Sequence, residues 1–252
     1  MEIPTAMADE TGFPYYLQVA QTIHRRVTEG QYQPGDTLPI ARKLEEDFGV
    51  SDITIRKALN LLVQKGIVIR KRGIGTSVTQ AEEDRATFDI TGDFSDLTDV
   101  ATGKPIPYEV EVLDICLTPF CPKSVKEILF LDPDHDVWRM RRIRKKNGEP
   151  ISYFINFGPP EVFRAIKKEF LYNQPFVEIA QKKCGIRFDR FEQLVEATSA
   201  DIDLASLLEI SFGEPLFFAV NIYYSAKDDP LAVTHMYFRG DRYRFGTSMK
   251  LP

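Results

Sequence analysis

Basic side chains, which bind anions, are concentrated in one short stretch of this 252-residue chain. Residues 53–80 carry six lysines and arginines and no acidic residue, whereas the whole chain has a formal net charge of -5. Subtracting these six positive charges leaves -11 on the remaining residues. A compact basic patch on an acidic protein can attract a polyanion such as nucleic acid to one surface. The more common meaning of such a run is a solvated charged face.

A second basic stretch lies on residues 137–145, whose apolar pattern predicts a β-strand. It carries four arginines within six residues: Arg139, Arg141, Arg142 and Arg144. Because side chains alternate along a strand, Arg142 and Arg144 share one face. Two guanidinium groups on one face can clamp a carboxylate or a phosphate. The residues alone slightly favour the alternative, an exposed face with surface ion pairs.

Residues suited to nucleophilic, metal or redox chemistry are sparse. The three cysteines, Cys116, Cys121 and Cys184, are odd in number and scattered, which predicts a reducing compartment and no disulfide framework. No histidine lies close in sequence to Cys116 and Cys121, so these two are interpreted as buried hydrophobes rather than metal ligands. No nucleophile motif, metal motif or Ser/His/Asp set is visible, so we expect no catalytic residue, no metal and no cofactor.

Neither a membrane span nor a secretion signal is visible in the sequence. No apolar run approaches the roughly 18 residues that a membrane span needs, and the first 12 residues contain acids instead of a basic and then apolar signal. We therefore expect a cytoplasmic protein with no membrane partner. The length and the 43% hydrophobic residues are sufficient for one large or two smaller folded domains.

The first 80 residues show the periodicity of three helices followed by a hairpin. Apolar residues recur at helical spacing over residues 16–27, 41–48 and 52–63, and a glycine follows each of these segments. Ser51 is a suitable N-cap for the third helix, which follows the second after a short turn. Two β-rich segments, 67–70 and 75–78, flank a basic tip. This order predicts a winged helix-turn-helix domain at residues 13–78, followed by a linker at residues 79–93.

The remaining residues, 94–252, predict an α+β domain with a mostly antiparallel sheet, because hairpins recur and no series of βαβ units is present. The Asn147-Gly148 dipeptide is a hairpin turn signal between two strands. The strand at residues 108–117 has an irregularity in the middle of its alternation. Strands are expected at 108–117, 137–145, 151–157, 187–197, 216–224 and 231–239, and helices at 122–131, 159–170, 175–184 and 201–210.

The segment TLPIARKLEEDFGVSDITIRKALNLLVQKGIVIRKRGIGTSV, residues 37–78, closely resembles the DNA-binding domain of the GntR family of bacterial transcription regulators. Small polar and basic side chains at the first turn of a recognition helix contact base edges, and basic wing residues approach a groove. The resemblance implies that several positions of this chain touch DNA. Together with neighbouring residues that are basic or would face the groove, these positions give the candidate DNA contacts. They are Arg42, Ser51, Asp52, Thr54, Arg56, Lys57, Arg72, Gly73 and Gly75.

Two positions depart from the pattern of that family. Ile40 stands where serine is common, and Asp52 stands where a basic residue is common. An aspartate at the groove repels phosphate and can accept a hydrogen bond only from a cytosine amino group. We therefore expect the operator of this protein to differ from the common operator type of the family.

The segments RMRRIRKKNGEPISYFINFGPP and MYFRGDRYRF, residues 139–160 and 236–245, resemble the UTRA domain of the HutC subfamily of GntR regulators. The resemblance implies a fold similar to that of chorismate lyase, an antiparallel sheet with helices that binds a small molecule. It implies that Arg142 and Arg144 grip an acidic group of an effector. Phe154 and Phe238 replace polar residues common in the family, which favours an anionic effector with an apolar or aromatic part, although both could be core residues.

These features lead to the expectation of a homodimeric, sequence-specific transcription regulator, a repressor, that binds a double-stranded DNA operator and an anionic small molecule. It would lie in the bacterial cytoplasm, and at the nucleoid when bound to DNA. The alternative is an enzyme of chorismate-lyase-like fold with a DNA-binding head, but a fold alone says little about function. An architectural DNA binder without a ligand is disfavoured, because the large second domain carries no net basic charge.

Overall fold

The computed structural model describes residues 13–71, 73, 75–79, 86–90, 109–168 and 176–247. The chain divides into two compact units, Met1–Asp84 and Arg85–Pro252, and each is described by itself. None of the helices in the described ranges is long and apolar enough to cross a membrane.

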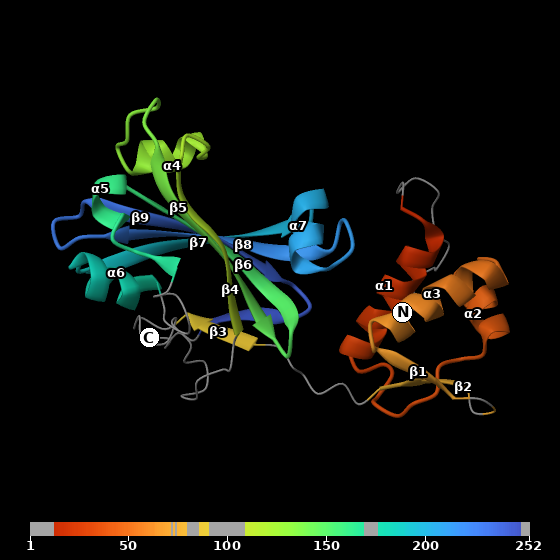
Figure 1. Cartoon of the computed structure of the whole chain (residues 1–252). Coiled ribbons are helices and arrows are strands. Elements are labelled where there is room, and N and C mark those ends of the chain that lie inside the picture. Colours follow the sequence, from red (N-terminus) through yellow and green to blue (C-terminus); the bar gives the residue numbers. More distant parts are fainter. Residues whose placement is uncertain are drawn as a thin grey trace, which may run out of the picture. The chain divides into compact units, whose positions relative to one another are not determined.

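The first unit is a three-helix domain with a β-hairpin (Figure 1), as the periodicity predicts. Its core is formed by apolar residues at helical spacing on all three helices, closed on the hairpin side by Val68 and Val78, which are register partners. Gly49 ends the second helix in a left-handed conformation, with φ 65°. The elements are α1 Tyr15–Thr28, α2 Ala41–Phe48, α3 Asp52–Gln64, β1 Val68–Lys71 and β2 Gly75–Val78.

The second unit contains a six-stranded sheet in the order β4-β5-β6-β9-β8-β7, in which all neighbours are antiparallel (Figure 1). The irregularity predicted in its first strand is a β-bulge between Val112 and Asp114. The strands are β4 Glu109–Thr118, β5 Val137–Lys146, β6 Glu149–Gly158, β7 Arg190–Ser199, β8 Pro215–Tyr224 and β9 Pro230–Arg239. The helices are α4 Lys123–Ile128, α5 Pro160–Phe163, α6 Phe176–Cys184 and α7 Ile202–Leu208.

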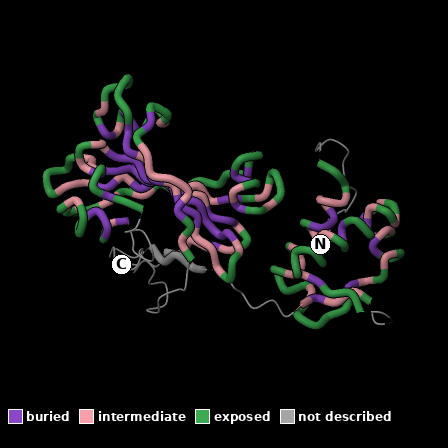
Figure 2. Tube along the Cα trace, in the orientation of Figure 1, coloured by how far each residue is buried: buried purple, intermediate pink, exposed green. Residues whose placement is uncertain are grey.

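The two faces of this sheet carry different coverings. Face A is the side of Trp138, Met140, Arg142 and Arg144 with their register partners, and face B is the side of Arg139, Arg141 and Ile143 with theirs. Residues of α5 and α6 pack on face A around Trp138, and residues of α4 and α7 pack on face B. Buried residues therefore run along the strands of the sheet, as Figure 2 shows.

The two largest differences from the sequence prediction are a missed pair of strands and a shortened helix. Strand β3, Ala86–Ile90, lies within the expected linker at residues 79–93 but pairs in parallel with β10, Tyr243–Thr247, so the second unit begins before residue 94. The helix expected at residues 159–170 is only α5 in its described part. The fully buried Phe163 at its end packs so closely on β6 that a Cβ on Gly158 would lie 2.2 Å from its ring. Residues 169–170 lie outside the described ranges.

Candidate nucleic-acid interface and ligand site

The N-terminus of α3 is capped by the hydroxyl groups that the sequence assigned to DNA. The Ser51 Oγ accepts a hydrogen bond from the Thr54 backbone N–H at 3.4 Å, and the two hydroxyl groups lie 3.0 Å apart. Capping by a serine satisfies one of the free N–H groups of the first turn. Ser51 and Thr54 are thus held in fixed positions at the start of the helix.

The exposed face of α3 presents basic residues, while its opposite face is buried in the core. Arg56 and Lys57 are exposed, and the residues at intervening positions, such as Ile55 and Leu59, are buried. The Arg56 Nε donates a hydrogen bond of 2.5 Å to Asp52 one turn earlier. Asp52 therefore offsets the positive charge of Arg56, which weakens the attraction of this turn for phosphate.

Arg42 is presented to solvent at the start of α2. Its side chain is 87% exposed, and its Nε lies 3.8 Å from the carboxylate of Glu46. An exposed pair at this distance holds the guanidinium weakly. Arg42 can therefore turn toward a phosphate or a guanine edge at low cost.

The hairpin of β1 and β2 forms the predicted wing. Its turn has two glycines with positive φ, Gly73 at 81° and Gly75 at 113°, a conformation that residues with a Cβ rarely adopt. Arg70 of β1 donates a hydrogen bond of 2.8 Å to Asn60 Oδ1 on the exposed face of α3, which ties the wing to the helix. The predicted contact Arg72 lies outside the described residues.

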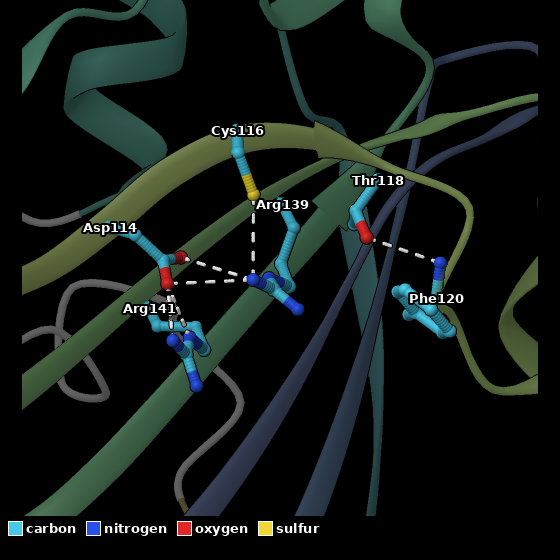
Figure 3. Close-up of polar contacts among 6 residues, drawn as sticks. All are labelled: Asp114, Cys116, Thr118, Phe120, Arg139 and Arg141. Carbon is cyan, nitrogen blue, oxygen red and sulfur yellow. Dashed lines mark hydrogen bonds and ion pairs between the residues drawn. The ribbon is translucent and has the colours of Figure 1, made fainter.

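The four arginines of β5 divide between the two faces of the sheet. Arg139 and Arg141 lie on face B and both reach toward Asp114 of β4, as Figure 3 shows. The Arg141 Nε lies 2.8 Å from one Asp114 oxygen, and Arg139 Nη2 lies 3.4 Å from the same oxygen and 3.4 Å from Cys116 Sγ. The hydrogen bond to Asp114 raises the pKa of Arg141. Arg139 and Arg141 therefore fit the alternative stated for the arginine-rich strand, in which its arginines form ion pairs.

Arg142, on face A, has no such carboxylate partner. The residue is 4% exposed, and its Nη2 donates a long hydrogen bond of 3.4 Å to Asn156 Oδ1. Its Nε is buried and has no hydrogen-bond partner, and none of the described residues forms an ion pair with it. Burial, and then the nearby charge of Arg144, lower the pKa of Arg142 to about 9. A buried cation without a counter-ion is a strong candidate for binding an anion.

Arg144 lies on the same face beside the two phenylalanines singled out in the sequence. Its guanidinium carbon lies 4.5 Å from the ring centroid of Phe154, within the range of a cation–π interaction. Phe154 meets Phe238 edge to face with ring centroids 5.6 Å apart. Both phenylalanines are buried in one apolar cluster with Met236. They therefore make the surroundings of Arg144 apolar.

A row of polar residues, most of them buried, extends across face A beside Arg142 and was not predicted from the sequence. Asn156 Nδ2 donates to Thr234 Oγ1 at 2.6 Å, and Gln193 Nε2 donates to Asn221 Oδ1 at 2.8 Å on the neighbouring strands. Asn221 Nδ2 lies 3.3 Å from the hydroxyl of Tyr223. The available signal was a polar residue interrupting an apolar strand, as in ISYFINF and FFAVNIY.

All three cysteines are free thiols and only partly buried, so Cys116 and Cys121 are not the fully buried hydrophobes that the sequence predicted. Burial raises the pKa of Cys121 to about 11. Among the described residues, no group of three or more His, Cys, Asp or Glu is arranged to hold a metal ion.

Comparison with known proteins assigns both units. The family described as "Bacterial regulatory proteins, gntR family" matches residues 15–78, and the UTRA domain matches residues 106–244. The chain is 27% identical to the mannosyl-D-glycerate transport/metabolism system repressor MngR of Escherichia coli (strain K12), over 92% of this chain and 94% of that protein. It is 24% identical to the repressor NagR of Bacillus subtilis (strain 168), over 94% and 95% of the two chains.

The fold agrees with that of a solved structure of similar length. The crystal structure of possible transcriptional regulator YydK from Bacillus subtilis has a TM-score of 0.56 and 22% identity, and covers 94% of this chain and 100% of that one. The UTRA match alone spans more than half of the chain, and the two relatives named above are described as repressors, not as enzymes. This chain therefore belongs to the gntR family of bacterial regulatory proteins, as a DNA-binding transcription regulator with a UTRA domain of the HutC type.

Proposed function

We propose that this protein is a repressor released from its operator by an anionic small molecule that binds between Arg142 and Arg144. The observation that carries the proposal is the buried guanidinium of Arg142, which lacks a carboxylate partner among the described residues. An anion placed there would supply the missing counter-charge and accept a hydrogen bond from the unpartnered Nε. Relatives that are named as repressors support the direction of the effect.

The surroundings of this pair of arginines narrow the chemistry of the effector. Phe154 and Phe238 give an apolar wall beside Arg144, while Asn156 and Thr234 give hydrogen-bonding groups beside Arg142. A carboxylate or phosphate ester joined to an apolar or aromatic part fits both sides. A sugar with many hydroxyl groups fits the phenylalanine side less well, because its hydroxyls would lose water there without gaining partners.

The DNA-binding side of the proposal places Arg42, Lys57 and Arg72 at phosphates and Ser51, Thr54 and Arg56 at base edges, with Gly73 and Gly75 letting the wing approach. A homodimer would carry two such heads. Dimers of this class read two half-sites about one helical turn apart, so a small change in the spacing of the heads weakens both contacts together.

The test uses full-length protein, an operator obtained by in vitro selection, and a panel of inorganic phosphate, sugar phosphates and aromatic carboxylates. At least one anion should raise the melting temperature and lower operator affinity in a gel shift. Arg144→Ala should abolish both effects while the domain stays folded. Arg141→Gln, which removes the same charge from the opposite face of the same strand, should keep both effects.

Two results would contradict the proposal. An anion that stabilises Arg144→Ala as much as the wild type would remove Arg144 from the site. An anion that binds but leaves the gel-shift curve unmoved would exclude simple release from DNA.

A further inference from the structure

An exposed isoleucine stands in the first turn of α3, among its polar side chains. Ile53 is 66% exposed, whereas Ile55 is fully buried. Residues three and four apart share one side of a helix, so Ile53 lies on the same side as Arg56, Lys57 and Asn60. All three of these residues are exposed. Ile53 is therefore part of the face that a recognition helix turns toward DNA.

The polar residues around Ile53 are engaged with one another. Ser51 and Thr54 form the helix cap, and Asp52 pairs with Arg56. Further along the same face, Asn60 accepts a hydrogen bond from Arg70. The charges of the first turn thus cancel, and Ile53 is its exposed side chain with only apolar surface to offer a base pair.

We propose that Ile53 sets the operator specificity of this protein by packing against the methyl group of a thymine. The 5-methyl of thymine is the one apolar group that base pairs display in the major groove. Opposite any other base, Ile53 would strip water from a polar edge without replacing its hydrogen bonds. The proposal goes beyond the repressor function and rests on α3 lying in the major groove.

Exchanging thymine for deoxyuridine tests the contact directly, because it removes only the methyl group. Full-length protein first selects its operator from a random duplex library, and each thymine of the half-site is then replaced by deoxyuridine in turn. At one thymine of the half-site the affinity of the wild type should fall about fourfold, the value expected for one buried methyl group. Ile53→Ala should bind the thymine and deoxyuridine duplexes equally at that position.

Ile202→Ala provides the matched control, since Ile202 is also strongly exposed, at 76%, but belongs to α7 of the second unit. It should reproduce the wild-type pattern. A selection repeated with Ile53→Ala should lose the thymine preference at the same position. The proposal is overturned if no thymine of the half-site is sensitive in the wild type, or if the fourfold loss persists in Ile53→Ala.

A failure of the underlying assignment would look different. If α3 does not enter the groove, Arg56→Ala and Lys57→Ala would bind the selected operator as tightly as the wild type does. If these two variants bind the operator more weakly but no thymine of the half-site is sensitive in the wild type, only the role of Ile53 is rejected.

Discussion

Single residues of this protein acquire their roles from their partners more than from their type. Arg141 and Arg142 are neighbours in sequence, yet Arg141 is held by Asp114 on face B and Arg142 is buried without a carboxylate on face A. The sequence could place the arginines on a strand and could separate its two faces. It could not identify Asp114 as the partner, because that pairing joins residues of different strands across a β-bulge.

The buried charge of Arg142 should cost stability at neutral pH. Its folded-state pKa of about 9 lies well below the ordinary value of a guanidinium group, so folding disfavours the charged form. This cost is fully present below about pH 9 and is relieved only as the pH rises above that value. Arg142→Met should therefore raise the free energy of unfolding by about 1–4 kcal/mol, while abolishing the anion-induced thermal shift.

Urea denaturation at pH 7 measures this change. The control is Arg141→Met on the same strand, which should lower stability because it removes a partner of Asp114. A lower stability of Arg142→Met than of the wild type would mean that its charge is compensated in the folded protein.

At the scale of elements, the sequence predicted the helices and strands that depend on residues close together in the chain. Helix α2 begins and ends where its periodicity and Gly49 indicate, and the irregular alternation of residues 108–117 became the bulge in β4. Strands β3 and β10 were missed because each is short and its partner lies far away along the chain. The polar row of face A was missed for a related reason, since Asn156, Thr234 and Asn221 meet only through strand pairing.

Strand β9 carries a histidine that should make the second unit sensitive to acid. His235 is buried between the rings of Phe157 and Phe218, with centroid distances of 5.4 and 5.2 Å. Burial lowers the pKa of His235 from 6.5 to about 4. Below pH 6.5 the histidine is therefore protonated in the unfolded chain, but in the folded chain it stays neutral down to about pH 4. The free energy of unfolding falls across this window by up to about 3 kcal/mol.

The variant His235→Phe should remove this part of the pH dependence, because phenylalanine fits between two aromatic rings and does not titrate. Chemical denaturation at pH 7.5 and 4.5 should show a smaller loss of stability in the variant than in the wild type. His135→Phe is the control, since the side chain of His135 is exposed. Equal pH slopes in His235→Phe and the wild type would show that His235 does not cause the loss.

At the scale of the whole molecule, a DNA-binding unit and a ligand-binding unit lie on one chain, and the proposed release must connect them. The effector could act by changing the head itself or by changing the spacing of two heads in a dimer. The Ser51 cap and the Arg70 hydrogen bond hold α3 within the first unit. We expect a change of spacing, because an intact head still binds a half-site when the second head is displaced.

The two mechanisms predict different affinities for half of an operator. With spacing as the mechanism, a saturating anionic effector should weaken binding to the full operator by about tenfold or more, a usual size for allosteric coupling. Binding to a duplex with a single half-site should stay unchanged. Fluorescence anisotropy with both duplexes at one salt concentration measures this, and Arg144→Ala provides the control in which the effector changes neither affinity. An equal loss on both duplexes would place the effect within the head and would reject the spacing mechanism.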